Sequence, residues 1–410
     1  MTMAAAPPPM RVWRTIPKGI WILGFVSLLM DVSSEMIHAL LPIYLVSVLG
    51  ASALTVGVIE GVAEATASVT KVFSGVLSDW LGRRQLLAAA GYGLAAFTKP
   101  VFALATSVGW FFAARFVDRI GKGIRGAPRD ALVADLAPAN LRGASFGLRQ
   151  ALDTVGAFAG PLLAIAIMAT TNDNFTVVFW VAVIPAFLSF GLIAFVVKDP
   201  KQTAAAAKVK SPLSMAELKR LGGAFWWVTL IAGVFTLARF SEAFLILKAQ
   251  AVGVPVDLIP GVYVVMNAVY AAGAYPAGVL SDRIDRVSVL FIGLVFLLVA
   301  DIVLAVAAGA FGVTVGIVLW GLHMAFTQGL FATLVADAAP RELRGTAFGA
   351  FNLVSGGALL VASLIAGGLW DTVGPAGTFI AGAIFTVAAF VGLLLVRGTL
   401  EKARAAIPSE

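Results

Sequence analysis

The sequence lacks cysteine altogether and holds only two histidines in 410 residues. The first absence excludes disulfides, thiolate metal sites and cysteine nucleophiles. The second excludes a histidine-rich metal-binding tract. Charged residues are also scarce, at 12% of the chain against roughly 25% in a typical soluble domain. The chain is instead 60% hydrophobic, with a mean hydropathy of +0.96, so its composition is that of a membrane protein.

Two common enzyme signatures are missing as well. The sequence contains neither the phosphate-binding pattern GxxxxGK[ST] nor the zinc-protease pattern HExxH. The glycine-rich stretch RIGKGIRGAP lies in a segment that we expect to be helical, whereas a nucleotide-binding loop follows a strand. We therefore expect no enzyme activity and no cofactor. The net charge of +7 lies mostly in short loops between apolar segments, so we expect no nucleic-acid partner either.

Twelve apolar segments are long enough to cross a lipid bilayer, which takes about 20 residues in a helix. No signal-peptide cleavage pattern precedes the first of them. We therefore predict an all-α membrane protein with twelve transmembrane helices. They span residues 19–48, 54–80, 84–106, 108–136, 142–170, 175–197, 222–250, 256–281, 286–308, 311–338, 343–370 and 375–397.

The lysines and arginines of the predicted loops all fall on one side of the membrane. Arg83 and Arg84 lie at the start of the third helix, Arg142 lies at the start of the fifth, and six basic residues lie in the long central loop. The opposite loops GASALT, TTNDNFT and DTVGPAGT hold neither residue type. Basic loops stay in the cytoplasm. Both termini are therefore predicted to be cytoplasmic, in an inner (plasma) membrane of the bacterial type.

The two halves of the chain repeat each other. SGVLSDWLGRR (74–84) matches AGVLSDRIDRV (277–287), and LVADLAPANLRGASFG (132–147) matches LVADAAPRELRGTAFG (334–349), both about half a chain apart. Such repeats are typical of transporters built from two pseudo-symmetric bundles. We predict a tail (1–18), a six-helix bundle (19–197), a cytoplasmic linker (198–221), a second bundle (222–397) and a second tail (398–410).

The loop GVLSDWLGRRQLL (75–87) resembles the loop signature of the major facilitator superfamily. The matching residues are Gly75, Asp79, Gly82, Arg83 and Arg84. Arg115 lies where that family has an arginine in its fourth helix. VGAFAGPLLA resembles the fifth-helix motif of antiporters through Gly156, Gly160 and Pro161. The resemblance implies two six-helix bundles around a central cavity, transport by alternating access, and a monomer.

The loop signature also predicts a gate. Charge pairs at helix ends can hold the bundles together in one state and release them in the other. A solvated charge cluster is the alternative interpretation. The residues assigned to the gate are Gly75, Asp79, Gly82, Arg83, Arg84, Asp135, Arg142 and Asp282.

The fourth predicted helix carries seven charges in the stretch RFVDRIGKGIRGAPRD (115–130). An ionisable residue at mid-membrane costs at least about 2.5–3.5 kcal/mol, so it faces a cavity or a partner. At 100° per residue the charges fall within an arc of roughly 140°. The helix therefore has one polar face, which either binds substrate or forms a structural network of salt bridges with acidic residues of the first and second helices.

Glu35 is the first candidate for proton coupling, because a carboxyl group among apolar helices holds its proton until a basic neighbour approaches. Asp31, one turn away, and Glu242, the counterpart of Glu35 in the repeat, are further candidates. The residues predicted to contact substrate are Arg115, Asp118, Arg119, Lys122, Arg125, His38, Glu64, Arg239, His323 and Gln328.

The favoured function is a proton-coupled exporter (antiporter) of a small molecule such as a drug or metabolite. Its partners would be the lipid bilayer, that small molecule and protons. Two alternatives remain open. Asp31, Glu35 and His38 have the spacing of a helical metal site, which suits a divalent transition-metal exporter. The basic stripe of the fourth helix suits a transporter of organic or phosphorylated anions.

Overall fold

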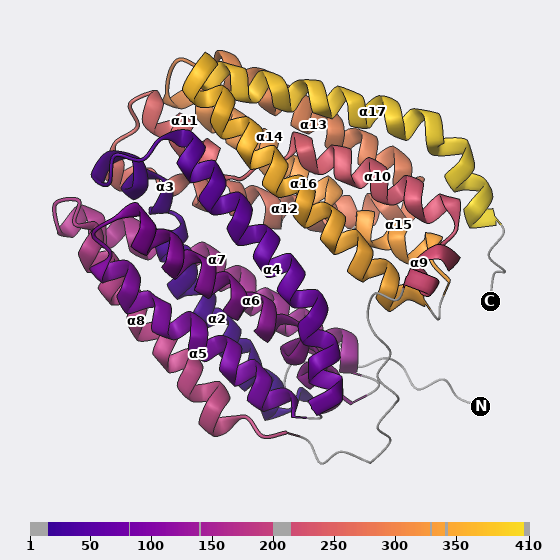
Figure 1. Cartoon of the computed structure of the whole chain (residues 1–410), viewed down its shortest axis with the longest axis horizontal. Coiled ribbons are helices and arrows are strands. Elements are labelled where there is room, and N and C mark those ends of the chain that lie inside the picture. Colours follow the sequence, from indigo (N-terminus) through magenta and orange to yellow (C-terminus); the bar gives the residue numbers. More distant parts are fainter. Residues whose placement is uncertain are drawn as a thin grey trace.

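The computed structural model describes residues 15–81, 83–138, 141–199, 215–328, 330–340 and 343–405. Two helical bundles lie side by side, one from each half of the chain (Figure 1). The described residues form helices joined by turns, with no β-strand among them. The predicted all-α fold with twelve membrane crossings is confirmed.

The first bundle contains the first six crossings. The first crossing is built from three pieces: α2 (Lys18–His38), α3 (Leu41–Ile43) and η1 (Tyr44–Val48). The next four are the single helices α4 (Ala53–Leu81), α5 (Arg84–Leu104), α6 (Val108–Leu136) and α7 (Arg142–Thr170). The sixth joins α8 (Phe175–Gly191) to η3 (Leu192–Val196).

The second bundle contains the other six crossings. Four are single helices: α12 (Gly261–Arg283), α13 (Arg286–Val306), α16 (Arg344–Val373) and α17 (Pro375–Ala405). The seventh crossing is split into α10 (Gly223–Ala238) and α11 (Ala243–Ala251), and the tenth into α14 (Ala310–Thr327) and α15 (Leu330–Ala338). The short helices α9 (Met215–Arg220) and η4 (Val256–Leu258) precede the seventh and eighth crossings.

The two split crossings of the second bundle differ from the continuous helices predicted over 222–250 and 311–338, as the three-piece first crossing differs from the helix predicted over 19–48. The first break spans residues 239–242, and at the second Gln328 has an extended backbone. Non-helical backbone at membrane depth is tolerated where it lines a cavity, because the freed polar groups then find partners. Arg239, Glu242 and Gln328 do line the central cavity. The sequence shows no proline at either break, so these interruptions were not predicted.

The polar fourth crossing also stands apart in hydropathy. Among the described residues, eleven segments are long and apolar enough to cross a membrane, and α6 is not one of them. The reason is the set of charges that α6 carries between Arg115 and Asp135. It packs closely against α4 and α5 within the first bundle, so its polar face meets protein rather than lipid.

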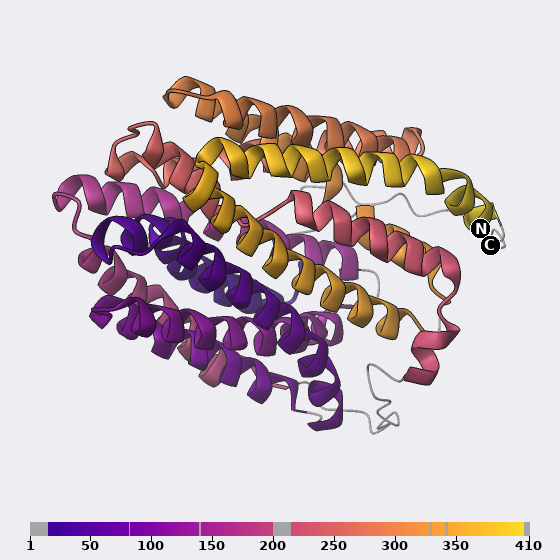
Figure 2. The same ribbon diagram turned by 45° about the horizontal axis from the view of Figure 1, so that its top comes forward.

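We call the end of the molecule that holds Lys18 and the end of α17 the terminal face, and the opposite end the distal face. The two bundles touch mainly through α4 and α16, and through α7 and α12. Helices α4 and α16 lie close together at the distal face and diverge toward the terminal face (Figures 1 and 2). Gly367 makes the close approach possible: a Cβ atom there would lie 2.7 Å from the Leu54 Cα atom.

A helix cap joins the bundles at the distal face. Asp371, near the end of α16, accepts hydrogen bonds from the backbone N–H groups of Ala53 (3.0 Å) and Leu54 (2.9 Å) at the start of α4. These N–H groups have no partner within their own helix, and a carboxylate there also interacts favourably with the helix dipole. Gln250 donates a further interbundle bond to Ser47, at 2.5 Å. The distal face is therefore closed in this structure.

Substitution of Asp371 by Ala is expected to favour separation of the bundles at the distal face. Loss of such a cap costs about 1 kcal/mol, which corresponds to a shift of roughly fivefold in the ratio of closed to open states. Spin labels at Thr170 and Phe311, both exposed near the distal face, would report the change as a longer distance in pulsed EPR. The cysteine-free sequence allows these labels to be attached without removing native thiols.

Thr372→Ala is the matched control, because the Thr372 hydroxyl donates to the Gly368 carbonyl oxygen within its own helix, α16. Identical distance distributions for Asp371→Ala and this control would show that the cap does not hold the distal face closed.

Candidate functional site

A cavity of about 500 Å³ lies between the bundles. Helices α2, α4 and α6 of the first bundle give it a charged wall, which we define as Glu35, His38, Glu60, Glu64 and Lys122. The second bundle gives it an aromatic wall, which we define as Phe235, Phe240, Tyr263, Phe331 and Phe351. The side chains between these rings are mainly polar: Thr236, Arg239, Ser241, Glu242, Asn267, Thr327, Gln328, Asn352 and Ser355.

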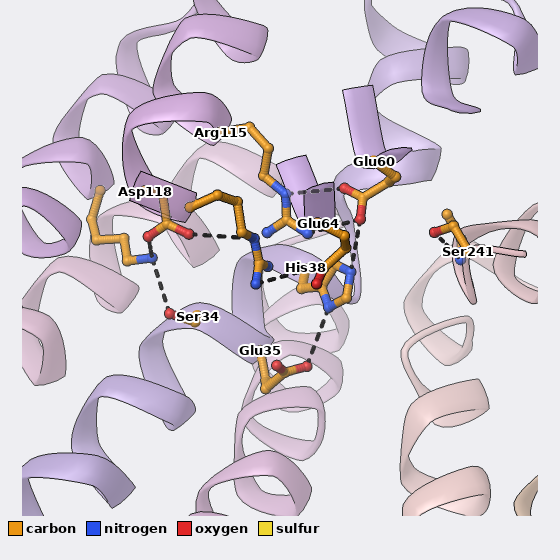
Figure 3. A network of polar contacts seen from close by, with 11 residues as sticks. Ser34, Glu35, His38, Glu60, Glu64, Arg115, Asp118 and Ser241 are labelled. Carbon is orange, nitrogen blue, oxygen red and sulfur yellow. Dashed lines mark hydrogen bonds and ion pairs between the residues drawn. The ribbon is translucent and has the colours of Figure 1, made fainter. Parts of the chain in front are cut away.

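The strongest ion pair of the charged wall joins α4 to α6. Arg115 donates two hydrogen bonds to Glu60, Nε to Oε1 at 3.0 Å and Nη2 to Oε2 at 2.8 Å (Figure 3). Both side chains are almost fully buried, with exposed fractions of 2% and 1%. A bidentate arginine–carboxylate pair satisfies both planar groups at once. Arg115 therefore neutralises Glu60 in the cavity wall.

His38 connects two carboxylates of the charged wall. Its Nδ1 lies 3.5 Å from Glu35 Oε2, and its Nε2 lies 3.3 Å from Glu60 Oε2 (Figure 3). The imidazole ring also stacks on Tyr263 of α12, with the ring centroids 5.2 Å apart. His38 thus links the titratable groups of the first bundle to an aromatic residue of the second.

A second set of pairs lies behind the wall. Arg119 Nη1 lies 3.2 Å from Glu64 Oε1, and Arg119 Nε lies 3.8 Å from Asp118. Lys99 of α5 donates to Asp118 at 2.8 Å and to Ser34 at 3.1 Å. Sequence reasoning did not identify Lys99, although a single lysine in an apolar helix is a sufficient signal of a buried partner. These contacts bind α2, α4, α5 and α6 together.

Lys122 is the basic residue of α6 that lines the cavity. It is exposed to the cavity, and no described carboxylate oxygen lies within 4.0 Å of its Nζ atom. Arg125, by contrast, is buried and lies over the ring of Tyr92, 4.9 Å from its centroid. Of the predicted substrate contacts on α6, the cavity wall therefore includes Lys122, whereas Arg115, Asp118, Arg119 and Arg125 lie behind it.

A further charge cluster lies nearer the terminal face. Arg149 pairs with Asp153 at 2.6 Å and lies 3.7 Å from Asp130, and Arg129 lies 3.3 Å from Asp130. Asp31 does not line the cavity, and it makes no hydrogen bond or ion pair with the described residues. The structure therefore separates the two acidic residues of α2: Glu35 faces the cavity and Asp31 does not.

The predicted residues of the second bundle are also separated. Arg239 and Glu242 line the cavity and pair with each other at 3.4 Å, and Gln328 lies in the same wall. His323 is fully buried, and its Nδ1 lies 3.0 Å from the Gly293 carbonyl oxygen. The Phe235 ring, 5.4 Å from the imidazole centroid, belongs to the aromatic wall. His323 therefore lies outside the cavity lining.

The glycine-proline motif has a clear packing role. A Cβ atom at Gly156 would lie 2.7 Å from the Leu28 carbonyl oxygen, and one at Gly160 would lie 2.8 Å from that of Val32. Gly160 also lies against the Cβ atom of Glu35. These glycines, with the buried Pro161 beside them, let α7 approach the part of α2 that carries Asp31 and Glu35.

The gate residues are described only in part. Arg84 forms an ion pair with Asp135 and also donates to the Ala131 carbonyl oxygen at 3.3 Å. Arg83 directly precedes α5, and Arg142 is the first residue of α7. Gly75 faces Ala127 of α6. Gly82 and the side chains of Asp79 and Asp282 lie outside the described residues. The gate therefore stays a prediction.

Two other chemistries find little support in the geometry. In the part of the chain that the structure describes, no three His, Asp or Glu side chains are grouped in a way that could hold a metal ion. The stretch GASFG (143–147) has the spacing of a hydrolase nucleophile elbow, which requires a strand-to-helix turn. Here the stretch lies inside α7, with Ser145 fully buried.

Comparison with known proteins identifies the family. A family model described as Major Facilitator Superfamily matches residues 23–356 and 242–410. The chain is a member of the major facilitator superfamily. Like its family, it is a multi-pass membrane transporter that works by alternating access between two bundles. The predicted family resemblance is confirmed, and the subfamily is not identified.

Similar proteins agree with this assignment. An uncharacterised MFS-type transporter of Methanocaldococcus jannaschii is 34% identical over 93% of this chain and 95% of its own. The inner membrane transport protein YajR of Escherichia coli is 24% identical over 90% of this chain and 80% of its own. Both matches extend over nearly the whole chain.

Two solved structures show the same fold at lower identity. A POT family transporter in complex with 5-aminolevulinic acid has a TM-score of 0.78, 13% identity, and coverage of 94% of this chain and 97% of its own. An inward-facing bacterial homologue of the human lysosomal transporter Spinster has a TM-score of 0.76 and 15% identity, and it covers 98% of this chain and 100% of its own.

The buried pair of Lys99 and Asp118 is expected to stabilise the first bundle. Removal of one partner leaves the other charge buried and unpaired, at a cost of about 3–5 kcal/mol. Lys99→Met and Asp118→Asn should therefore each lower the thermal midpoint of the purified protein, measured by fluorescence-detected size exclusion. The thermal midpoint of the double variant should fall by less than the sum of the decreases in the two single variants.

Lys71→Met provides the control, because Lys71 is exposed on α4 and has no ion pair among the described residues. Strict additivity of the two single effects would show that Lys99 and Asp118 do not interact energetically.

Proposed function

We propose that this transporter is a proton-coupled antiporter that exports a small amphipathic molecule. Glu35 carries the proposal. It is the acidic residue of the charged wall that has no arginine partner among the described residues, and its side chain is 24% exposed. It can therefore exchange a proton or a substrate cation with the cavity, whereas Glu60 and Glu64 are held by Arg115 and Arg119.

Competition for Glu35 supplies the coupling. A carboxylate in a cavity of low polarity is stabilised by one positive charge, which a proton or a cationic group of the substrate can provide. If the two exclude each other, each transport cycle carries substrate in one direction and a proton in the other. His38 lies between Glu35 and Glu60 and can hold the proton close to the carboxylate during the exchange.

The stacking of His38 on Tyr263 relates this exchange to the movement of the bundles. The ring contact joins α2 of the first bundle to α12 of the second, and alternating access requires the bundles to move relative to each other. A change in charge at Glu35 or His38 alters the environment of this contact. In this mechanism, protonation biases which face of the transporter is open.

The orientation follows from the basic loops. We place the terminal face, with both termini, in the cytoplasm of a cell bounded by an inner membrane of the bacterial type. The closed distal face then makes this the inward-facing state, in which substrate enters from the cytoplasm. Protons would enter from the outside in exchange, and a monomer holds the complete cavity.

Charge placement weakens the two alternatives that were left open. A metal site would need Asp31 beside Glu35 and His38, but Asp31 lies outside the cavity lining. The anion alternative relied on a basic stripe, of which Lys122 is the member exposed to the cavity. A simple anion would also face the carboxylates of Glu35 and Glu64.

Substitution of Glu35 by Gln is expected to abolish proton flux coupled to substrate in proteoliposomes that contain a pH-sensitive dye. The amide keeps the shape of the side chain and does not bind a proton at neutral pH. The panel of substrates comprises cationic aromatic drugs, zwitterionic aromatic compounds, organic and phosphorylated anions, and divalent metals, each added outside vesicles of the wild type and the variant.

Asp31→Asn and Glu242→Gln serve as matched comparisons, because each removes one of the other candidate carboxylates. Full coupled proton flux in Glu35→Gln, in protein that elutes as a folded species, would refute the assignment. Loss of coupling in Glu242→Gln alone would move the proton site to the second bundle.

A further inference from the structure

The charges around the cavity cancel in pairs, with one acid and one base left over. Glu60 pairs with Arg115, Glu64 with Arg119, and Glu242 with Arg239. Glu35, His38 and Lys122 complete the set of acidic and basic residues that line the cavity, and His38 lies between Glu35 and Glu60. Glu35 is therefore the carboxylate of the cavity wall without a lysine or arginine partner among the described residues, and Lys122 is the ammonium group without a carboxylate partner there.

These two groups form no direct ion pair with each other. No carboxylate oxygen of the described residues lies within 4.0 Å of Lys122 Nζ, and the Glu35 carboxylate contacts His38 instead. Both side chains belong to the same wall of the cavity, on α2 and α6. Each leaves a charge available to a ligand, because partial exposure to the cavity keeps both groups accessible.

A ligand of one charge sign fits this arrangement poorly. An anion at Lys122 would meet the nearby carboxylates, and a cation at Glu35 would meet the ammonium group of Lys122. Like charges brought close together in a cavity cost free energy and exclude the wrong partner. A molecule with one group of each sign satisfies both residues at once.

The facing wall indicates the rest of the ligand. Five aromatic side chains stand across the cavity from the charged wall, with amide groups from Asn267, Gln328 and Asn352 between them. Apolar and aromatic surfaces bind the body of a small ligand, and a few polar groups orient it. A volume of about 500 Å³ suits a ligand of small-molecule size.

We infer that the substrate is a small zwitterion with an aromatic or apolar body, and that Lys122 selects for its anionic group. Glu35 binds the cationic group, a carboxylate or phosphate lies at Lys122, and the body lies against the aromatic wall. The inference rests on the proposed function, because the cationic group displaces the proton from Glu35. The inference adds Lys122 as the residue that determines which cationic molecules bind at Glu35.

Lys122 suits this task better than arginine would. Its ammonium group is a compact charge on a flexible stem, which can follow anionic groups of different geometry, whereas the arginines of this region are fixed by bidentate or buried contacts. The adjacent Gly121 and Gly123 pack closely against α5 and α4. The backbone that carries Lys122 is therefore fixed while its side chain stays adaptable.

The test measures equilibrium binding to the purified full-length protein, without a proton gradient, by isothermal titration calorimetry. The probes are matched triples on one aromatic body: tryptophan, tryptamine and indole-3-propionate, with phenyl and naphthyl triples of the same design. The wild type is expected to bind at least one zwitterion roughly tenfold more tightly than the amine and the acid of the same triple. Absence of such a preference in every triple overturns the inference.

Substitution of Lys122 by Gln should remove the preference. The zwitterion should bind at least tenfold more weakly, while the amine binds as well as before or more tightly, because its repulsion from Lys122 is gone. Lys122→Arg keeps the charge and should retain the preference. Lys71→Gln, on α4 outside the cavity lining, should behave as the wild type. An equal loss for all three probes in Lys122→Gln would show a structural role and contradict the inference.

The outcome is independent of the coupling test. A zwitterion preference that depends on Lys122, together with unchanged proton flux in Glu35→Gln, would support the selectivity and refute the proton site. If Glu35→Gln loses coupled proton flux but the wild type shows no preference for a zwitterion, the proposal of a proton-coupled antiporter stands and the proposed selectivity of Lys122 is refuted.

Discussion

The need to pair charges inside a membrane governs the first bundle. A charged side chain in the hydrocarbon region is tolerated only when a partner or water surrounds it, and α6 brings several such groups into one helix. The bidentate contact between Arg115 and Glu60 gives each of these two deeply buried side chains a partner of opposite charge. Because its two members belong to different helices, the pair also fixes the register of α4 against α6. Lys99 and Asp118 fix α5 against α6 in the same way.

The two bundles therefore contribute different properties to one transporter. The first bundle is cross-linked by ion pairs whose positions are tightly defined, so it can hold Glu35 and Lys122 at set places in the cavity wall. The second bundle contributes one ion pair, Arg239 with Glu242, and a set of aromatic rings to the cavity, and two of its crossings are interrupted. Aromatic surfaces accept bodies of different shape, and breaks in a helix allow small adjustments. The charged wall thus selects the substrate by its charge, and the aromatic wall accepts substrates of different shape.

Much of this architecture could be predicted from the sequence, because hydropathy, loop charges and the internal repeat each report on a long stretch of chain. The polar arc of α6 was also predictable from helical geometry. The sequence could not predict which acidic residue pairs with each basic residue of α6. Arg115 could contact Glu60, Glu64 or Glu35, depending on how α4 and α2 are rotated about their axes. The same limit applies to Lys122, whose lack of a partner is decided by the neighbours of three helices. The cap by Asp371 joins residues more than 300 positions apart, which no local pattern reveals.

The polarity of α6 has a consequence for how the protein is made. A segment that is not apolar enough to cross on its own does not partition readily from the translocation channel into lipid. Its partners Glu60 and Lys99 lie on α4 and α5, which leave the ribosome before α6 does. The N-terminal order of helices thus places the counter-charges in the membrane first. Integration of the fourth crossing then depends on helices already present, so biogenesis of this bundle is cooperative rather than one helix at a time.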